Sequence, residues 1–180
     1  MMKVLAFAAT NSSQSINKAL VTHAAELLKN NTDAEFEVLD LNDFEMPIYS
    51  SDRENESGIP APAQAFRNKI AEADAILISF AEHNGSYTAA YKNLFDWTSR
   101  IDQKVYQNKK AVLLATSPGP GGAQNVLGSA VGSAPYFALE VKGSLSVPSF
   151  YDNFDGEKGV LTNDELSEQL VEQLSLLTNA

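Results

Sequence analysis

Hydroxyl and amide side chains are concentrated in one short stretch near the beginning of the chain. Residues 10–17 read Thr-Asn-Ser-Ser-Gln-Ser-Ile-Asn and are followed by the apolar periodicity of a helix. Hydroxyl groups beside the free backbone N–H groups of a helix N-terminus bind phosphate. A Walker loop is excluded because the stretch lacks the required Gly-Lys-Ser/Thr ending. We therefore expect a phosphate site here, with a serine-rich helix cap as the alternative.

A second polar stretch, Glu82-His83-Asn84-Gly85-Ser86, separates the apolar residues 75–80 from a second helical pattern. An Asn-Gly pair permits the left-handed backbone of a tight turn, and Ser86 is a suitable N-cap for the following helix. Because Gly85 has no side chain, the main chain can approach a flat ring closely and present N–H and C=O groups to its edge. A well-formed turn without a ligand is the alternative interpretation.

A third stretch is rich in glycine. Residues 116–122 read Thr-Ser-Pro-Gly-Pro-Gly-Gly and follow the apolar residues 111–115. The glycines Gly119, Gly121 and Gly122 would let the backbone meet the same flat ring from another side. One ligand held by all three stretches is a simpler explanation than three unrelated turns.

Each of the three polar stretches lies between a predicted strand and a predicted helix. Each follows a short, largely apolar segment that reads as a buried strand, at residues 4–8, 75–80 and 109–115, and each precedes a helix. Such alternation predicts a doubly wound parallel sheet with helices on both faces. Five strands fit the flavodoxin-like order 2-1-3-4-5, in which ligands bind beyond the carboxyl ends of the strands at the switch point between the first and third.

The remaining elements complete this alternating pattern. An edge strand is expected at residues 35–41, a helix at 62–72, a helix rich in small residues and therefore closely packed at 121–134, and a fifth strand at 137–141. A last helix spans residues 162–177, where Thr162 and Glu165 form a capping box. We expect one domain over residues 1–180, without repeats.

Residues 42–60 show no periodicity and are long for a connection inside a compact domain. Their apolar side chains indicate a ligand cover, a contact with a second subunit, or packing on the chain's own helices. The helix after Ser86 carries Tyr87, Tyr91 and Phe95 on one side and Trp97 on another. A helix that is apolar nearly all round is buried on both sides, which favours a dimer through this helix or through residues 42–60.

Composition limits the possible partners. The net charge is −10, which argues against a nucleic-acid or anionic-membrane partner. The chain has no cysteine, so disulfides, thiol catalysis and cysteine zinc sites are excluded. No apolar run approaches the ~20 residues of a membrane span, and no signal-peptide pattern is present. We expect a cytoplasmic protein without a metal site.

Flavin mononucleotide (FMN) has both chemical parts that the three stretches suit, a phosphate and a planar ring. The motifs also resemble the NAD(P)H-dependent FMN reductase family. The resemblance rests on Glu82-His83-Asn84-Gly85-Ser86, on Lys92-Asn93-Leu94-Phe95-Asp96-Trp97 and on Ser117-Pro118-Gly119-x-Gly121-Gly122, and it covers most of the chain in order and spacing.

The resemblance implies a flavodoxin-like fold, bound FMN and ping-pong transfer of two electrons from NADPH or NADH to a flavin, quinone or azo-type acceptor. It also implies a homodimer or homotetramer. Position by position, it assigns the phosphate to Thr10, Ser12, Ser15, Ile16 and Asn17. It assigns the ribityl chain and the ring to Glu82, His83, Asn84 and Gly85, and it places Ser117 and Gly119 beside the ring. No acid–base side chain is required, because the chemistry takes place on the flavin.

Some positions differ from the family's usual pattern. Ala9, Thr10 and Ser12 stand where glycine, serine and arginine are usual, and the missing arginine removes a charged contact to phosphate and nicotinamide. Ala81 replaces a proline. His83 replaces a tyrosine, either as a simple polar substitute or as a group that stacks on the ring.

Three rival functions remain open. One is a flavodoxin-like electron carrier without NAD(P)H oxidation, which the acidic composition suits. A second is a nicotinamide-binding Rossmann enzyme that uses Gly119-x-Gly121, although Gln124 stands at the third glycine position, with Glu140 as the ribose contact. The third is a degenerate family member that binds a protein partner and no flavin.

Overall fold

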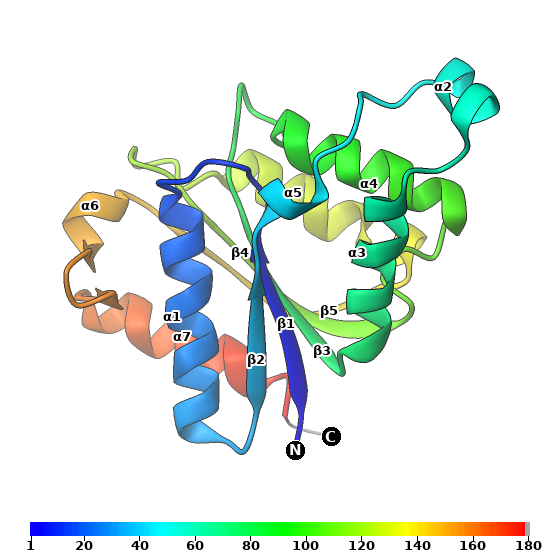
Figure 1. Cartoon of the computed structure of the whole chain (residues 1–180). Helices are drawn as coiled ribbons and strands as arrows, with labels where there is room; N and C mark the ends of the chain where they lie inside the picture. The colour runs from blue at the N-terminus through cyan, green and yellow to red at the C-terminus, as the bar shows by residue number, and fades with distance from the viewer. Residues whose placement is uncertain (179–180) are drawn as a thin grey trace.

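A computed structural model describes residues 1–178 and has a five-stranded parallel sheet at its centre (Figure 1). The strands lie in the order β2-β1-β3-β4-β5, which confirms the predicted doubly wound, flavodoxin-like fold. They are β1 (Lys3–Ala8), β2 (Glu35–Leu39), β3 (Ala75–Phe80), β4 (Lys109–Thr116) and β5 (Leu139–Val147).

Two helical layers cover the sheet. On one face lie α1 (Ile16–Asn31) and α7 (Asp164–Ser175). On the other lie α3 (Ala61–Glu72), α4 (Ala89–Ile101) and α5 (Gln124–Ser133). The shorter elements are η1 (Leu41–Phe44), α2 (Ser51–Ser57), η2 (Ala134–Phe137), α6 (Phe150–Asn153) and the hairpin of β6 (Phe154–Asp155) and β7 (Val160–Leu161).

The central strands are apolar on both sides because both helical layers bury them. Val4 and Ala6 of β1 pack toward α1 and α7, whereas Leu5 and Phe7 pack toward α3 and α4. All residues of β3 are buried. This double burial fixes the carboxyl ends of β1, β3 and β4 beside one another, and with them the loops that follow.

Two helix caps differ from the sequence prediction. Helix α4 begins after Thr88, whose hydroxyl accepts from the backbone N–H of Tyr91 at 3.2 Å, because Ser86 is already paired with His83 across a turn. Helix α7 is capped by Asn163 instead of Thr162. In both places the residue nearer the helix has a free side-chain oxygen in an extended backbone, which is the geometry that a cap requires.

Two further predictions, the end of the fifth strand and the close packing of the small residues, were wrong in part. Strand β5 runs to Val147, beyond the predicted end, and Phe137 lies in η2. The small residues Gly128 and Gly132 of α5 face outward, and a side chain added at either would meet open space. Trp97 and Tyr91 of α4 are buried within this chain, so the aromatic residues of that helix do not by themselves require a second subunit.

Residues 45–60, called the arm below, leave the body of the molecule and return to it (Figure 1). Asn93 of α4 holds the arm by accepting from the backbone N–H of Tyr49 at 2.8 Å and donating to the carbonyls of Met46 and Pro47 at 3.1 Å. Trp97 Nε1 donates to the same Pro47 oxygen at 2.7 Å. The arm therefore packs on the chain's own helix at its base, while α2 at its tip contributes no buried residue.

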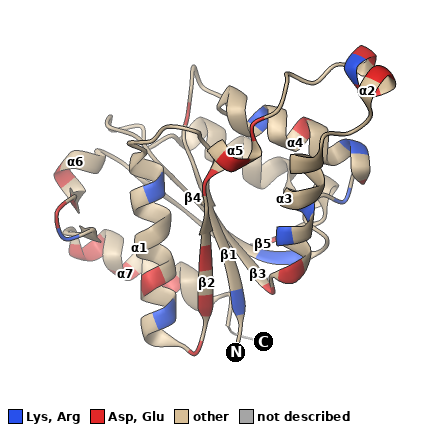
Figure 2. Cartoon of the chain, viewed as in Figure 1, with Lys and Arg blue, Asp and Glu red and all other residues tan. Residues whose placement is uncertain are grey.

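Charged side chains of both signs are interspersed over the visible elements, with no continuous basic face in this view (Figure 2). Among residues 1–178, no helix is long and apolar enough to cross a membrane. The same residues contain no group of three or more histidine, cysteine, aspartate or glutamate side chains placed to hold a metal ion.

Candidate active site

The three stretches singled out in the sequence meet at the carboxyl edge of the sheet, after β1, β3 and β4. Hydrogen bonds join them to one another. Thr88 Oγ1 donates to the carbonyl of Ala9 at 2.8 Å and so ties the loop after β3 to the loop after β1. The backbone N–H of Ala9 donates to the carbonyl of Ser79 at 2.8 Å. Thr88 was not among the predicted site residues.

The first loop presents unpaired backbone donors. Ser15 caps α1, and its Oγ accepts from the N–H of Lys18 at 3.0 Å. The N–H groups of Ile16 and Asn17, at the first two positions of the helix, have no acceptor among residues 1–178. Such groups carry the positive end of the helix dipole and bind anions.

The side chains of the first loop lie in different surroundings. Ser12 is exposed, and its backbone N–H donates to Thr10 Oγ1 at 3.3 Å. The side chain of Thr10 is buried beneath the loop. The hydroxyl of Ser12, which stands at the family's arginine position, faces solvent without a charge. Phosphate binding in this chain would therefore depend on backbone donors and the helix terminus.

Asn17 points inward, under the loop. Its Oδ1 accepts from the hydroxyl of Ser79 at 2.7 Å and from the N–H of Thr116 at 3.0 Å, and its Nδ2 donates to the Thr116 carbonyl at 3.1 Å. One buried amide thus joins α1 to β3 and β4. The side chain of Asn17 positions the loops, whereas its backbone N–H, like that of Ile16, has no acceptor among residues 1–178.

Lys18 is the basic residue in the first turn of α1. Its Nζ donates to Asp40 at 2.8 Å, and both side chains are about 40% exposed. The hydrogen bond from Lys18, followed by that from the N–H of Asn42, lowers the pKa of Asp40 to about 2. The lysine charge is therefore shared with a carboxylate that stays ionised at neutral pH. Sequence reasoning missed Lys18 because its significance depends on the nearby Asp40 of another element.

The second loop is a two-residue hairpin turn. His83 and Ser86 exchange backbone hydrogen bonds of 2.9 and 3.1 Å. Asn84 and Gly85 both have positive φ angles, 53° and 77°, as a type I′ turn requires. This confirms the predicted left-handed backbone. The turn is exposed and stands clear of the sheet edge, so its backbone groups and the side chain of His83 are accessible.

Glu82, at the base of this turn, faces the other way. Its Oε2 accepts from the N–H of Val126 at 2.8 Å, in the first turn of α5. The carboxylate therefore caps α5 and connects the second loop to the third. A negative charge is favourable at a helix N-terminus.

The third loop is joined to the end of β5. The carbonyls of Ser117 and Gly119 accept from the N–H groups of Phe150 and Ser149 at 3.0 and 2.9 Å. Gly119 is open on its free side. Gly122 is not, because its φ is +58° and a Cβ there would lie 2.2 Å from Ser146 Oγ. The fold, therefore, requires glycine at residue 122.

A cavity of about 330 Å³ lies between the second loop and the base of the arm. Asn11 of the first loop and His83 of the second contribute to its wall, and Met46 and Ile48 of the arm lie opposite. Asn42 Nδ2 closes one side by donating to the carbonyl of Asn11 at 3.0 Å. The cavity thus places apolar side chains beside two of the predicted ligand loops.

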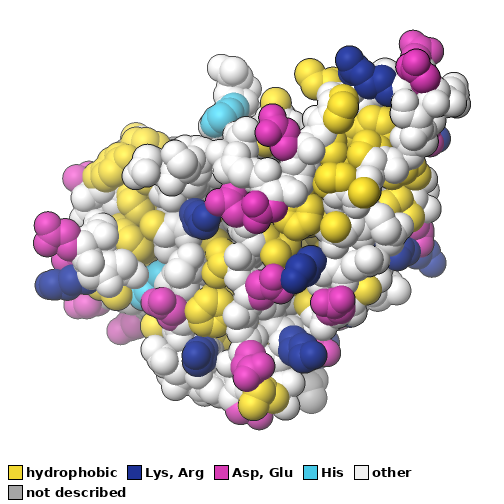
Figure 3. All heavy atoms as spheres, viewed as in Figure 1, with side chains coloured by type: hydrophobic (Ala, Val, Ile, Leu, Met, Phe, Trp, Pro, Cys, Tyr) yellow, Lys and Arg dark blue, Asp and Glu magenta, His cyan; other side chains and the backbone are white. Residues whose placement is uncertain are grey.

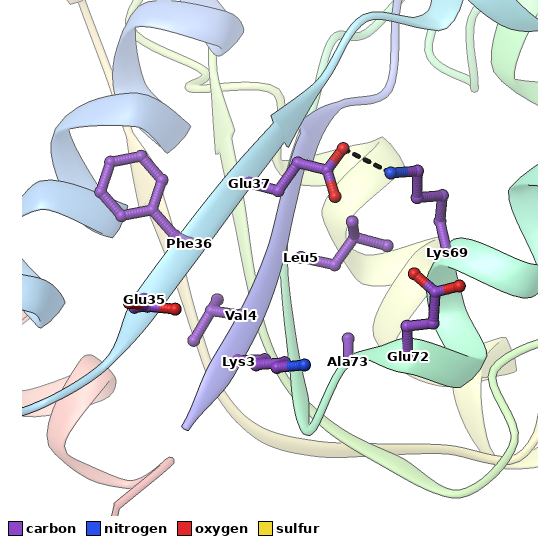
Figure 4. Close-up of a pocket in the computed structure, with 9 residues that line it drawn as sticks. All are labelled: Lys3, Val4, Leu5, Glu35, Phe36, Glu37, Lys69, Glu72 and Ala73. Atoms are coloured by element: carbon purple, nitrogen blue, oxygen red, sulfur yellow. Dashed lines mark hydrogen bonds and ion pairs between the residues drawn. The ribbon is translucent and has the colours of Figure 1, made fainter. Parts of the chain in front are cut away.

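A different cavity, of about 230 Å³, lies between the amino-terminal halves of β1 and β2 and the end of α3 (Figure 4). Lys69 crosses it to Glu37 at 2.7 Å. None of the predicted site residues lines it. It lies away from the carboxyl ends of the strands, where ligands of such sheets bind.

The sequence pattern of the NADPH-dependent FMN reductase family matches residues 2–151. The chain belongs to this family. That membership confirms the resemblance drawn from the motifs, and it agrees with the position of the three loops.

Similar proteins include reductases of this family. An NAD(P)H:quinone oxidoreductase of Solanum tuberosum is 31% identical over 169 residues, which cover 87% of this chain and 80% of that protein. An NAD(P)H-dependent FMN reductase of Pseudomonas aeruginosa is 30% identical over 98% of this chain and 93% of its own. The solved structure of FerB, a flavoenzyme NAD(P)H:(acceptor) oxidoreductase from Paracoccus denitrificans, aligns over 99% of this chain and 96% of its own with a TM-score of 0.76 at 21% identity. That last likeness concerns the fold.

The residues present fit the FMN expected for the family. Two N–H groups without an acceptor among residues 1–178, at the start of α1, suit a phosphate, and the exposed backbone of Asn84 and Gly85 suits the edge of a ring. Gly119 leaves the third loop open to a close approach. The site has the donor groups that an anionic, flat ligand needs, although it lacks the arginine.

Proposed function

We propose that this chain is an NAD(P)H-dependent FMN oxidoreductase that passes two electrons to small electrophilic acceptors of the quinone, flavin or azo type. The observation that carries the proposal is the meeting of unpaired helix N–H groups, the type I′ turn and the open glycine loop at one edge of the sheet. Membership of the NADPH-dependent FMN reductase family supports the same chemistry.

In this proposal the flavin phosphate lies against the first loop. The N–H groups of Ile16 and Asn17 bind it, and the exposed hydroxyl of Ser12 adds a further donor. Ser15 and Thr10 keep the loop in shape through their own hydrogen bonds. Since Lys18 is already paired with Asp40, the helix terminus supplies most of the attraction.

The second and third loops orient the ring in this proposal. The backbone of Asn84 and Gly85 forms hydrogen bonds with one edge of the ring, and Ser117 and Gly119 flank the ring. Glu82 contributes by holding the turn to α5 at the 2.8 Å contact with Val126. Bound FMN would accept a hydride from NADPH or NADH and deliver it to the acceptor, so no side chain is assigned a proton-transfer step.

We assign the acceptor to the cavity between the second loop and the arm. Its volume of about 330 Å³ is suited to a one- or two-ring molecule. Met46 and Ile48 offer an apolar wall, and His83 offers a polar edge. Quinones and azo compounds have flat apolar rings with polar atoms at the rim, so they match this lining.

We further propose that the whole chain works as one domain, in a homodimer or homotetramer in the cytoplasm, where NAD(P)H is available. Apolar side chains gather over the arm and the neighbouring helices in Figure 3. Ile48 is 75% exposed and Ile59 is 37% exposed. Covering them would require a second surface.

The first test is the visible spectrum of the protein after incubation with FMN and removal of unbound flavin. A retained flavin that bleaches under anaerobic NADPH or NADH, and recovers on addition of a benzoquinone, is the expected result. A retained flavin that neither nucleotide bleaches would establish an electron carrier instead. Failure to retain FMN at micromolar concentration would overturn the proposal.

A sharper test removes a single donor. Ile16→Pro deletes one unpaired N–H at the first helical position, where proline is tolerated, and the extended backbone of Ser15 suits a residue before proline. We expect FMN affinity to fall by about 10- to 100-fold, the value of a hydrogen bond to a charged group. Asp164→Pro, at the first position of α7, is the matched control and should leave FMN affinity unchanged.

A further inference from the structure

A groove opens from the first loop, residues 10–17, to which we assign the flavin phosphate. It has a volume of about 590 Å³, begins at residues 13–16 and runs along the outer side of α1. Its opposite wall is formed by α6 and by the turn between β6 and β7. None of the three loops' ring-binding residues lines it, so the proposed FMN site does not account for the groove.

One wall of this groove is aromatic. Phe150 is buried and stacks on Phe154 with ring centroids 4.6 Å apart, and Phe154 meets the edge of His23 at 5.9 Å. Tyr151 packs edge-on against Phe150 at 5.5 Å yet is 70% exposed. Hydrophobic side chains are visible over α6 in Figure 3. Because Phe150 supports Tyr151 from one side, the exposed side of the Tyr151 ring is available for stacking.

The groove also carries charges suited to a nucleotide. Lys18 lies at its upper end, next to residues 10–17, where its ammonium is also paired with Asp40 at 2.8 Å, and Lys158 lies at the turn opposite α1. The ammonium of Lys158 is 3.6 Å from Asp155 and its side chain is 76% exposed. Glu26 and Glu157 also line the groove, and their carboxylates can accept from ribose hydroxyls or from an exocyclic amine.

We infer that this groove binds an adenosine 5′-phosphate group, and that its source is the adenylate half of flavin adenine dinucleotide (FAD). The inference rests on the proposed function, because FAD is FMN with an adenylate joined to its phosphate. A phosphate held at the start of α1 directs anything attached to it toward the groove that opens there. The chain therefore accepts FAD as well as FMN, with the adenine on Tyr151 and the second phosphate near Lys18.

The length of the groove agrees with this occupant. From Ser15 to Glu26 the helix advances through three turns, on the order of 16 Å at the standard rise per residue. The groove's volume of about 590 Å³ lies within the range of small-molecule binding sites. Aromatic stacking tolerates any base, so recognition of adenine in particular would come from the carboxylates.

The test is a competition between the two flavins on the complete chain. The protein is equilibrated with an equimolar mixture of FMN and FAD and separated from unbound flavin, and the retained flavins are quantified by chromatography. We expect a retained FAD:FMN ratio above about 0.3. Tyr151→Ala should lower that ratio about 10-fold, since stacking of one base on an aromatic ring has this value. Tyr136→Ala, which changes another exposed tyrosine outside the groove, should leave it unchanged.

The outcomes separate the two proposals. Retention of FMN with a FAD:FMN ratio below about 0.3, or a ratio that Tyr151→Ala does not lower, overturns the groove assignment alone. If neither flavin is retained, the proposed function fails and the groove assignment fails with it. If Tyr151→Ala raises the KM for NADPH while the flavin ratio stays constant, the adenosine belongs to the reductant, and the FAD assignment is wrong.

Discussion

The side-chain oxygen of Asn17 accepts a hydrogen bond from the backbone N–H of Thr116 at 3.0 Å, across 99 residues of sequence. The same oxygen accepts from Ser79. The end of β4, the end of β3 and the start of α1 are therefore held by one side chain. The geometry of the phosphate loop depends on this buried amide.

Removal of that amide should weaken the whole fold. Asn17→Ala leaves the N–H of Thr116 and the hydroxyl of Ser79 buried without their acceptor, so we expect the free energy of unfolding to fall by about 2–3 kcal/mol. Urea denaturation measures this loss. Ser12→Ala, an exposed neighbour in the same loop, should stay within about 0.5 kcal/mol of the parent. A loss below about 1 kcal/mol for Asn17→Ala would contradict the bridging role.

The turn at Asn84 and Gly85 should be sensitive to an added methyl group. Gly85 has a φ of +77° and open space around it, so Gly85→Ala tests backbone strain without a clash. We expect a loss of about 1 kcal/mol in thermal or urea unfolding, and weaker FMN binding. Gly128→Ala, in the exposed face of α5, should instead gain about 0.5–1 kcal/mol from helix propensity. A Gly85→Ala variant as stable as the parent would show that the turn is not strained.

The arm should open more often when Asn93 of α4 is removed, although Trp97 still donates to Pro47. Asn93→Ala deletes the three hydrogen bonds to Tyr49, Met46 and Pro47. We expect trypsin cleavage after Arg53 to become about 10-fold faster, in proportion to the local opening equilibrium. Mass spectrometry of timed digests locates the cut. Lys92→Ala, on the neighbouring position of α4, is the control, and an equal acceleration there would argue against the anchor.

His23 should make the protein less stable under mildly acidic conditions. Its Nε2 accepts from the N–H of Leu161 at 3.4 Å, and burial lowers its pKa below 6.5 while Glu26 opposes the shift. Because the unfolded state takes up the proton first as pH falls, stability is complete above 6.5 and is lost as the pH falls below that value. His23→Gln keeps an acceptor but does not titrate.

The measurement is urea unfolding of the parent and of His23→Gln between about pH 5 and pH 8. The parent should lose more stability toward the acidic end than the variant does. Parallel profiles for the two proteins would show that His23 is not the source of the pH dependence, and the prediction would be wrong.

The sheet could be predicted because its central strands are apolar on both faces. The predicted bounds of β3 match the structure, and the ends of β1 and β4 differ by one residue. Strand β5 was harder, because it lies at the sheet edge and contains Lys142, Gly143 and two serines. Half-exposed edge strands carry a weaker apolar pattern. Helix α2 was missed because its seven residues include no apolar side chain.

The positions of the three loops were also predictable, since the chain order of strands and helices determines which loops share an edge. The directions of individual side chains were not. Glu82 and Asn17 were predicted to hold a ligand, and the structure adds that their side chains bond to Val126 and Thr116. Thr88 and Lys18 gain their importance from contacts with Ala9 and Asp40. Contacts between distant segments leave no local pattern in the sequence.

The arm and the loops at the carboxyl edge of the sheet can change independently of each other over evolutionary time. Its base contributes Met46 and Ile48 to the cavity that we assign to the acceptor, whereas α2 at its tip buries nothing. The loops after β1, β3 and β4, in contrast, are joined by buried hydrogen bonds that fix them to the sheet. Substitutions, insertions or deletions in residues 51–57 would therefore leave the sheet intact. New acceptor preferences can arise in the arm while the electron-carrying centre stays as it is.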